Sequence, residues 1–248
     1  MMPTIIPGDQ IVVNKLLFGA RIYSSLDFSD HAPLNAWRVK GFRKIKPNEI
    51  IVFNFPYGYN NWSKIEFRIN YVYAKRVIGA PGDSVSIVDG HYSNNHHEGS
   101  LGVEKMQATL QGIPDSTLMK RNSFRAVPLS RDLWSIKHFG PLYIPAKGDA
   151  IHLTRENGII YKRIIEYETK DSLVCTDGLL YKGDQLVDQY MFTKNYYFAC
   201  GDNTPNSNDS RYWGFVPEDF IIGIVTRVAY SRDPETHEIR WDRVWKKL

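Results

Sequence analysis

The sequence predicts a mostly β protein, built from coiled antiparallel sheets, with a second β-rich subdomain inserted into it. Three observations support this fold class. Turn residues are followed four times by a short run of apolar, often β-branched residues. The chain is rich in aromatic residues that favour strands, with 15 Tyr, 12 Phe and 6 Trp. Long stretches with helical periodicity are scarce.

The four turns place the expected strands in order. Their sequences are Gly8-Asp9 before QIVV, Asn48-Glu49 before IIVF, Gly82-Asp83 before SVSIV and Gly148-Asp149 before AIHL. Glycine and aspartate adopt turn conformations readily, and the β-branched residues that follow favour extended backbone. Further strands are expected at 71–78 (YVYAKRVI) and 158–168 (GIIYKRIIEYE), and short helices at 102–111 and 129–138.

A change of composition divides the chain. The polar, turn-rich segment GHYSNNHHEGSLG begins at residue 90, and the stretch after it mixes basic residues with prolines. We therefore expect a core formed by 1–90 and 196–232, an insertion subdomain at 91–195 and a basic, aromatic tail at 233–248.

Size and charge limit the possible functions. The 248 residues are 43% hydrophobic and 23% charged, which is enough to bury a normal core. The formal net charge of +4 has no basic block behind it, so we expect no nucleic-acid partner, although an anionic membrane surface could attract the chain weakly. No apolar run approaches the roughly 18 residues of a membrane span, and the start lacks the features of a cleavable signal peptide.

A lysine within an apolar strand is the first candidate for chemistry. In YAKRVIGAPGD, strand alternation places Lys75 on one face with Tyr73 and Val77, opposite Ala74 and Arg76. If that face is buried, desolvation favours the neutral amine that a general base requires. The alternative is an edge-strand lysine that points into solvent.

The stretch GDNTPNSNDSRYWGFV at 201–216 is the second candidate. Short polar side chains such as Asn203, Ser207 and Ser210 hydrogen-bond to nearby backbone and form tight loops. Arg211 stands near two aspartates, Asp202 and Asp209, and a bidentate ion pair could hold the loop in place.

Taken together, MMPT with the following turn and strand, IIVFNFP, YAKRVIGAPGD and GDNTPNSNDSRYWGFVPEDFIIG resemble the ordered motifs of bacterial type I signal peptidases. The motifs occur in the family's order and cover about half of the chain, residues 1–90 and 196–230. This resemblance implies a serine endopeptidase that removes N-terminal signal peptides from exported preproteins with a Ser/Lys dyad and no cofactor. In that family the nucleophilic serine precedes the Met-x-Pro-Thr residues, so it is expected immediately before Met1, and residues 1–248 alone are expected to be inactive.

The resemblance also implies roles for individual residues. Lys75 corresponds to the general base, and Ser207 to the hydroxyl that orients it. The loop's supporting polar network corresponds to Arg76, Asp202, Asp209, Ser210 and Arg211. Shallow pockets that accept the small side chains of an Ala-x-Ala cleavage site are expected from Met1, Met2, Ile11, Val52, Tyr73 and Ala74.

The same resemblance implies partners and a location. The substrate would be an extended signal peptide added as a strand beside 71–78. The intact protein would reside in the cytoplasmic membrane, with this domain on the periplasmic side, close to the membrane surface. Two segments could touch that surface, PYGYNNW at 56–62 and WDRVWKKL at 241–248, although local packing is an equal alternative for each.

Other readings remain open at this level. His91, His96 and His97 lack metal-ligand partners at suitable spacing, so a solvated loop is expected and no metal. Cys175 and Cys200 could form one disulfide or remain two thiols. The alternative functions are a non-catalytic relative that binds exported peptides, and a self-cleaving Ser/Lys peptidase.

Overall fold

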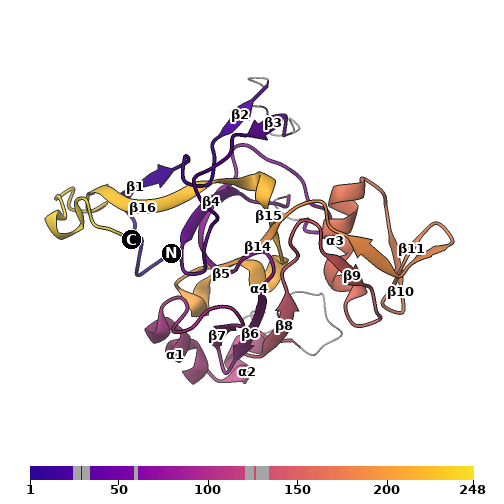
Figure 1. The fold of residues 1–248 in the computed structure, drawn as a ribbon. Coiled ribbons are helices and arrows are strands. Elements are labelled where there is room, and N and C mark those ends of the chain that lie inside the picture. The colour runs from indigo at the N-terminus through magenta and orange to yellow at the C-terminus, as the bar shows by residue number, and fades with distance from the viewer. Residues whose placement is uncertain (25–28, 30–33, 59–60, 121–125, 127–133) are drawn as a thin grey trace.

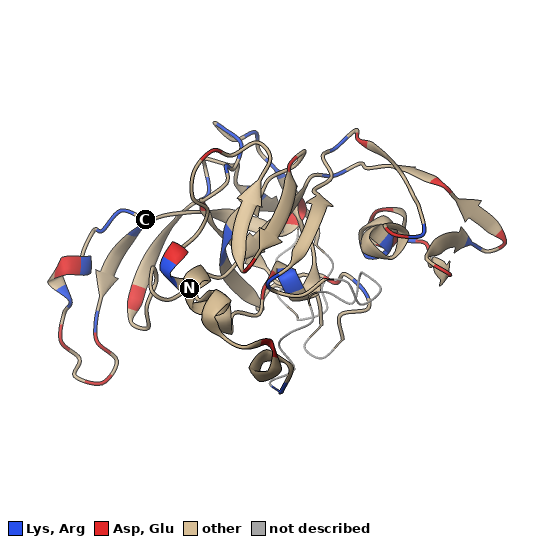
Figure 2. Ribbon diagram, turned by 90° about the horizontal axis from the view of Figure 1, so that it is seen from below, with Lys and Arg blue, Asp and Glu red and all other residues tan. Residues whose placement is uncertain are grey.

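The computed structural model describes residues 1–24, 29, 34–58, 61–120, 126 and 134–248. The protein is mostly β, with antiparallel strand pairs throughout (Figure 1). The C-terminal tail and the strands of the 174–187 region lie at opposite ends of the molecule, and acidic and basic residues are interspersed along it (Figure 2). The predicted fold class is confirmed.

A six-stranded sheet forms the centre, in the order β1-β16-β4-β5-β14-β15. Its strands are β1 (Asp9–Asn14), β4 (Ile50–Asn54), β5 (Val72–Gly79), β14 (Tyr196–Cys200), β15 (Val216–Pro217) and β16 (Ile221–Ser231). Every one of these residues lies in the ranges expected for the core, and β1, β4 and β5 confirm the strands predicted there. The division into domains itself stays a prediction.

The two faces of this sheet carry different apolar clusters. In the β4–β5 pair, Ile51 lies opposite Lys75 and Val52 lies opposite Ala74. Ile51 packs into the main core together with the aromatic residues of the sheet. Val52 and Ala74 pack into a smaller cluster on the other face. Strand alternation therefore places Lys75 on the face of the main core, together with Tyr73 and Val77.

Among the described residues, smaller sheets and four helices surround the central sheet. Two of these sheets are pairs, β2 (Arg21–Tyr23) with β3 (Ala36–Arg38) and β9 (Ala150–His152) with β13 (Gln189–Met191). The other two have three strands each: β6 (Ser84–Val88) lies between β7 (His91–Asn94) and β8 (Phe139–Tyr143), and β11 (Leu179–Lys182) lies between β10 (Val174–Thr176) and β12 (Gln185–Val187). The helices are α1 (Glu104–Gly112), α2 (Asp115–Lys120), α3 (Gly158–Thr169) and α4 (Ser210–Trp213). Short 3-10 turns are η1 (Thr204–Asn206), η2 (Glu218–Phe220) and η3 (Trp241–Arg243). The expected boundary after residue 90 falls inside the β6–β7 hairpin.

The strand predicted at 158–168 is wrong, because these residues form α3. Its isoleucines favour a strand when each is considered alone. Its buried positions, however, are Ile160, Tyr161, Ile164 and Ile165, and the repeat of four residues is the spacing of one helix face. The helix predicted at 102–111 is confirmed by α1. In the helix predicted at 129–138, residues 129–133 lie outside the described residues and 134–138 are not helical.

The tail packs against the start of the chain. Arg243 of η3 forms an ion pair with Asp9, whose carboxylate accepts Nε at 2.9 Å and Nη2 at 2.5 Å. The same guanidinium donates to the carbonyl of Thr4 at 2.8 Å. Within the described residues, no helix is both long and apolar enough to cross a bilayer. Both cysteines are free thiols, with Cys200 buried and Cys175 partly buried.

Candidate active site

The site is centred on the contact between Lys75 and Ser207. Lys75 lies on β5, which stands between β4 and β14 in the sheet, and its side chain is partly buried instead of pointing freely into solvent. Its Nζ donates a hydrogen bond of 2.9 Å to Oγ of Ser207, which follows η1. Burial lowers the pKa of Lys75, and Arg211 lowers it further, against the opposing effects of nearby acids such as Asp209. The amine is thereby made easier to deprotonate than an exposed lysine.

A glycine makes the close approach possible. A Cβ added to Gly201 would lie 2.1 Å from Oγ of Ser207 and 3.1 Å from Nζ of Lys75. Any side chain at position 201 would therefore push Ser207 away from the lysine. Gly201 immediately follows β14, and the absence of a side chain at this position lets the hydroxyl of Ser207 approach the amine of Lys75.

A fully buried ion pair stabilises the loop at 201–216. Arg211 donates to Asp209 through Nε and Nη2, both at 2.8 Å, and neither side chain is exposed to solvent. Asp209 also caps α4 and accepts the backbone N–H of Gly201 at 3.0 Å. Although burial opposes ionisation, Arg211 holds the pKa of Asp209 below its ordinary value. Ser210 accepts the backbone N–H of Ala199 at 3.0 Å, which joins the loop to β14.

A second ion pair joins β5 to the loop. Arg76 donates to Asp202 through Nε at 2.7 Å and Nη2 at 2.8 Å, a bidentate geometry. Its Nη1 donates to the carbonyl of Asn48 at 2.6 Å, and Nη2 lies 3.4 Å from the hydroxyl of Thr4. The five polar residues predicted to support the site therefore form two separate ion pairs and one hydroxyl contact around Lys75.

The first residue of the chain reaches the same place. Burial lowers the pKa of the Met1 amino group, and the positive charge of Lys75 lowers it further, whereas Asp202 raises it. The backbone N–H of Ile5 donates to the carbonyl of Met1 at 3.1 Å, so residues 1–5 form a turn at the site. The backbone nitrogen of Met1 thus lies within electrostatic range of the lysine.

Four of the six residues predicted to line substrate pockets come together. Met1, Ile11, Val52 and Ala74 belong to one apolar cluster on the sheet face opposite the main core. Tyr73 lies on the other face, where its ring centre is 5.5 Å from Nζ of Lys75. Met2 is not part of the cluster, and 47% of its surface is exposed.

Sequence reasoning missed four residues that shape the site: Gly201, Cys200, Asn48 and Thr4. Cys200 is the β14 residue paired with Arg76, and burial raises the pKa of its thiol well above the usual value. Gly201 stood at the start of the quoted loop, directly after the apolar run YYFAC at 196–200, and this position was the available signal. Asn48 and Thr4 stood in the quoted turn and the MMPT motif, but their contacts with Arg76 are made between distant segments and could not be read from those patterns.

The site's polar groups suit proton transfer. Among the described residues, no three His, Cys, Asp or Glu side chains are grouped to hold a metal ion. His96 of the histidine segment instead contacts the carboxylate of Asp83 at 3.1 Å. The arrangement combines a desolvated amine, a hydroxyl that positions it and an adjacent apolar surface.

Comparisons with known proteins identify the relatives of this chain. A family model described as signal peptidase, peptidase S26, matches residues 1–230. Signal peptidase I from Buchnera aphidicola of the aphid Acyrthosiphon pisum is 30% identical over 251 residues, which cover 96% of this chain and 68% of the relative. Its counterpart from Pseudomonas aeruginosa is 27% identical over 233 residues, covering 90% of this chain and 59% of the relative. The chain therefore spans about two thirds or less of the length of these relatives.

One solved structure is also similar. Signal peptidase I from Enterococcus faecalis is 21% identical, covers 74% of this chain and 98% of its own, and aligns with a TM-score of 0.33. The family assignment does not depend on this alignment, because the family match and the curated relatives support it independently.

Proposed function

The chain belongs to the signal peptidase family, peptidase S26, and on this premise we propose that it is the catalytic part of a serine endopeptidase that removes N-terminal signal peptides from exported preproteins. The observation that carries the proposal is the 2.9 Å contact between Nζ of Lys75 and Oγ of Ser207. The Met1 amino group lies within electrostatic range of Lys75, so we expect a serine joined to Met1, in the order Ser-Met-x-Pro-Thr, to approach this amine.

The proposed reaction uses Lys75 as general base. Neutral Lys75 accepts the proton of the serine hydroxyl while the serine oxygen bonds to the scissile carbonyl carbon. The resulting ammonium gives that proton to the departing amine of the mature protein, and the C–N bond breaks. Lys75 then deprotonates a water molecule whose oxygen bonds to the acyl carbon. The ester C–O bond breaks, and the ammonium of Lys75 returns the proton to the serine oxygen. Ser207 keeps the amine oriented through both steps.

The apolar cluster supports the proposed substrate class. Met1, Ile11, Val52 and Ala74 form an apolar cluster on the sheet face opposite the Lys75 side chain, which Ala74 joins to the strand position next to Lys75. Such a surface accepts small uncharged side chains at the residues before a cleavage site. β14 pairs with β5 from Arg76 to Gly79 only, which is compatible with a substrate strand lying along the earlier part of β5.

The test compares two chains that differ at one residue. A short N-terminal leader ending in serine is joined to Met1, and the control leader ends in alanine. We expect cleavage of a preprotein at its Ala-x-Ala site by the first chain and none by the second or by residues 1–248 alone. Equal cleavage by the serine and alanine chains would show that the nucleophile is elsewhere.

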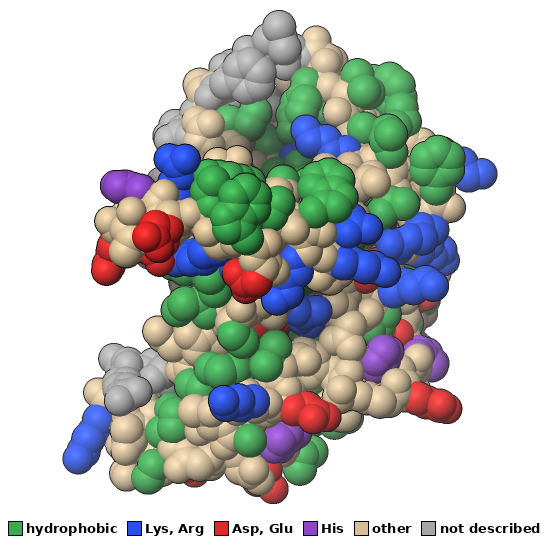
Figure 3. All heavy atoms as spheres, turned by 90° about the vertical axis from the view of Figure 1, so that its left-hand side faces the viewer, with side chains coloured by type: hydrophobic (Ala, Val, Ile, Leu, Met, Phe, Trp, Pro, Cys, Tyr) green, Lys and Arg blue, Asp and Glu red, His purple; other side chains and the backbone are tan. Residues whose placement is uncertain are grey.

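We also propose that the protein works at the surface of the cytoplasmic membrane, on its periplasmic side. The face that carries the tail shows hydrophobic side chains beside a band of lysines and arginines (Figure 3). Trp241 and Trp245 are 74% and 60% exposed, and Lys246 and Lys247 follow them in the chain. Tryptophan favours the membrane interface and lysine is attracted to anionic headgroups, so this pairing suits an anionic bilayer. Tyr57 of the other candidate segment is buried in the core.

A further inference from the structure

A cavity far from the dyad in the fold has the character of a ligand site. Its volume is about 530 Å³, and it lies between α3, β3 and the segment around η2. An adjoining cavity of about 360 Å³ shares Ile65, Tyr167 and Lys170 with it and is also lined by Lys64. The ring of Tyr167 belongs to the main core, on the sheet face opposite the proposed peptide-binding cluster. The residues that line the two cavities are different from those of the candidate active site.

Three lysines surround the ring of Tyr167. Nζ of Lys170 lies 4.2 Å from the ring centre and Nζ of Lys194 lies 5.9 Å from it. Lys64 lines the adjoining cavity, which Tyr167 and Lys170 also line. Burial lowers the pKa of Lys170, and the charges of Lys194 and Lys64 lower it further, whereas Asp219 raises it, so Lys170 is repelled by both neighbouring ammonium groups. An anion among them would relieve this repulsion.

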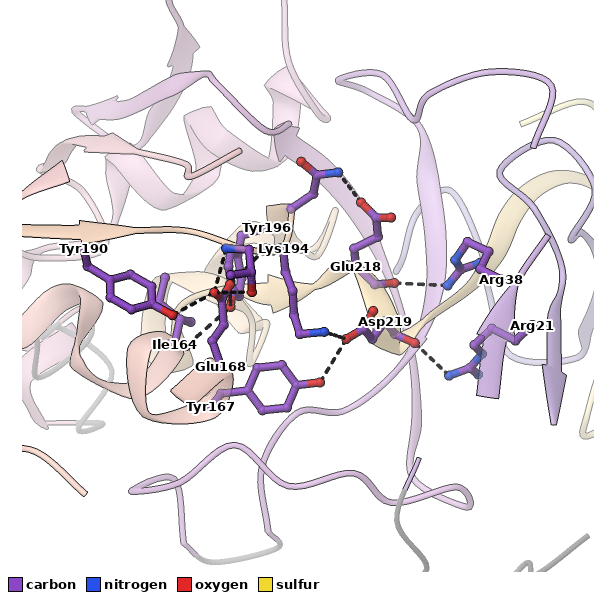
Figure 4. Close-up of polar contacts among 12 residues, drawn as sticks. Arg21, Arg38, Ile164, Tyr167, Glu168, Tyr190, Lys194, Tyr196, Glu218 and Asp219 are labelled. Atoms are coloured by element: carbon purple, nitrogen blue, oxygen red, sulfur yellow. Dashed lines mark hydrogen bonds and ion pairs between the residues drawn. The ribbon is translucent and has the colours of Figure 1, made fainter. Parts of the chain in front are cut away.

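The carboxylates of the region already have partners. Asp219 Oδ2 accepts Nζ of Lys194 at 2.6 Å and the hydroxyl of Tyr167 at 3.2 Å. Glu168 accepts the hydroxyls of Tyr190, Thr193 and Tyr196 and two backbone N–H groups (Figure 4). Within the described part of the chain, neither Lys64 nor Lys170 has a carboxylate at ion-pair distance.

Two buried guanidiniums add to the positive charge. Arg21 and Arg38 donate to the backbone carbonyls of Asp219 and Glu218 behind the cavity (Figure 4). Burial lowers the pKa of Arg21 to about 10, so it is still protonated at neutral pH. Neither arginine is within ion-pair distance of a carboxylate among the residues the structure describes. The lysines and acids that line the two cavities are equal in number, but Lys64, Lys170 and these two arginines have no carboxylate at ion-pair distance among the described residues, so unpaired positive charge gathers here.

We propose that this cavity binds a phosphate ester, with Lys64, Lys170 and Lys194 contacting the phosphate oxygens and Phe67 and Phe220 contacting the organic part. Ammonium groups on flexible stems suit a compact anion with several oxygens. The volume exceeds that of phosphate alone, and Phe67 and Phe220, whose ring centres are 5.5 Å apart, form an apolar wall for the remainder of the ligand. A soluble phosphate ester and a phospholipid headgroup share this chemistry.

The test measures binding to the chain of residues 1–248 directly, so its outcome is independent of peptidase activity. Glycerol 3-phosphate and inorganic phosphate are titrated by NMR and calorimetry, and phosphatidylglycerol vesicles are tested by sedimentation. We expect the ester to bind, and the double variant Lys64→Gln with Lys170→Asn to weaken it at least about tenfold. Asparagine is chosen at 170 because that residue has a φ of 62°, which asparagine tolerates. The control is Lys105→Gln on α1, which should bind as the unaltered protein does.

Asp219→Asn provides a prediction of opposite sign. It removes the acid that competes for Lys194, so phosphate ester binding should strengthen by about threefold, whereas mere damage to the fold would weaken it. Vesicle binding that disappears in the lysine double variant would identify a lipid headgroup as the ligand, and binding of the free ester alone would identify a soluble ligand. The proposal is overturned if no probe binds, or if the double variant binds as well as Lys105→Gln.

Discussion

Gly201→Ala is the substitution whose effect follows most directly from the geometry of the site. The added Cβ would lie 2.1 Å from Oγ and 2.8 Å from Cβ of Ser207, where ordinary contacts begin at 3.4 Å. The backbone of Gly201 is not in the left-handed region, so alanine meets no conformational obstacle there. The substitution is therefore destabilising for a steric reason, because the added Cβ displaces Ser207.

The expected magnitude has two parts. Ser207 must move by about 1.3 Å to reach an ordinary contact, which its 2.9 Å hydrogen bond to Lys75 cannot accommodate. Loss of a hydrogen bond to a charged or basic group is worth about 1.5–3 kcal/mol, so kcat/KM should fall about tenfold to a hundredfold if Lys75 is the base. Overpacking should lower the free energy of unfolding by about 1–3 kcal/mol.

The assay is a double-mutant cycle with Ser207→Gly, which removes both atoms that Cβ would strike. In the serine-extended chain, preprotein cleavage and urea unfolding are measured for the two single variants and the double variant. In the Ser207→Gly background, Gly201→Ala should cost less than about 0.5 kcal/mol of unfolding free energy. Equal costs in both backgrounds would refute the steric reasoning, and unchanged cleavage by Gly201→Ala would refute the role of the Lys75–Ser207 contact.

Three further predictions concern the base, the buried ion pair and the membrane surface. Because the pKa of Lys75 is lowered, kcat/KM of the serine-extended chain should rise with pH through an inflection below 10.5. Lys75→Ala should abolish cleavage while the circular dichroism spectrum is retained. A near-normal cleavage rate for that variant would contradict the role of Lys75 as base. Asp209→Asn should lower the free energy of unfolding by about 3–5 kcal/mol at pH 7, because it leaves the Arg211 charge buried and unpaired. The folded-state pKa of Asp209 is depressed, so its stabilising effect is complete above the ordinary value of 3.8 and is lost as pH falls through the folded value. Urea unfolding of both proteins from pH 7 to pH 3 measures the effect of the substitution and its pH dependence. A decrease in unfolding free energy of less than about 1 kcal/mol at pH 7 would contradict the predicted effect of Asp209→Asn. Trp245→Ser should reduce co-sedimentation with phosphatidylglycerol vesicles about threefold. Met119→Ser, a similarly exposed control on α2, should leave co-sedimentation unchanged. Equal reductions by the two variants would argue against the tail as the membrane-contacting segment.

Sequence reasoning located β1, β4 and β5 of the central sheet because their signals are local. A turn before a β-branched run can be recognised within a few residues and predicts β1 and β4, and the apolar run at 71–78 predicts β5. It predicted no strand at β14, β15 or β16. It failed at α3, where each isoleucine favours a strand but the spacing of the buried ones is helical. That spacing is visible in the sequence and outweighs single-residue propensity, because most helical stability comes from packing one face.

By itself, the sequence determined the fold class, the family and the residue types of the site, since Lys75 and the loop at 201–216 lie in short contiguous motifs. Only the tertiary structure decided which aspartate pairs with which arginine. Asp202 pairs with Arg76 and Asp209 with Arg211, although Asp202 is 126 residues away from its partner. It also decided that Gly201 limits the contact between Lys75 and Ser207. Contacts between distant segments depend on strand order and register, which are set by packing of the whole chain and leave no local pattern.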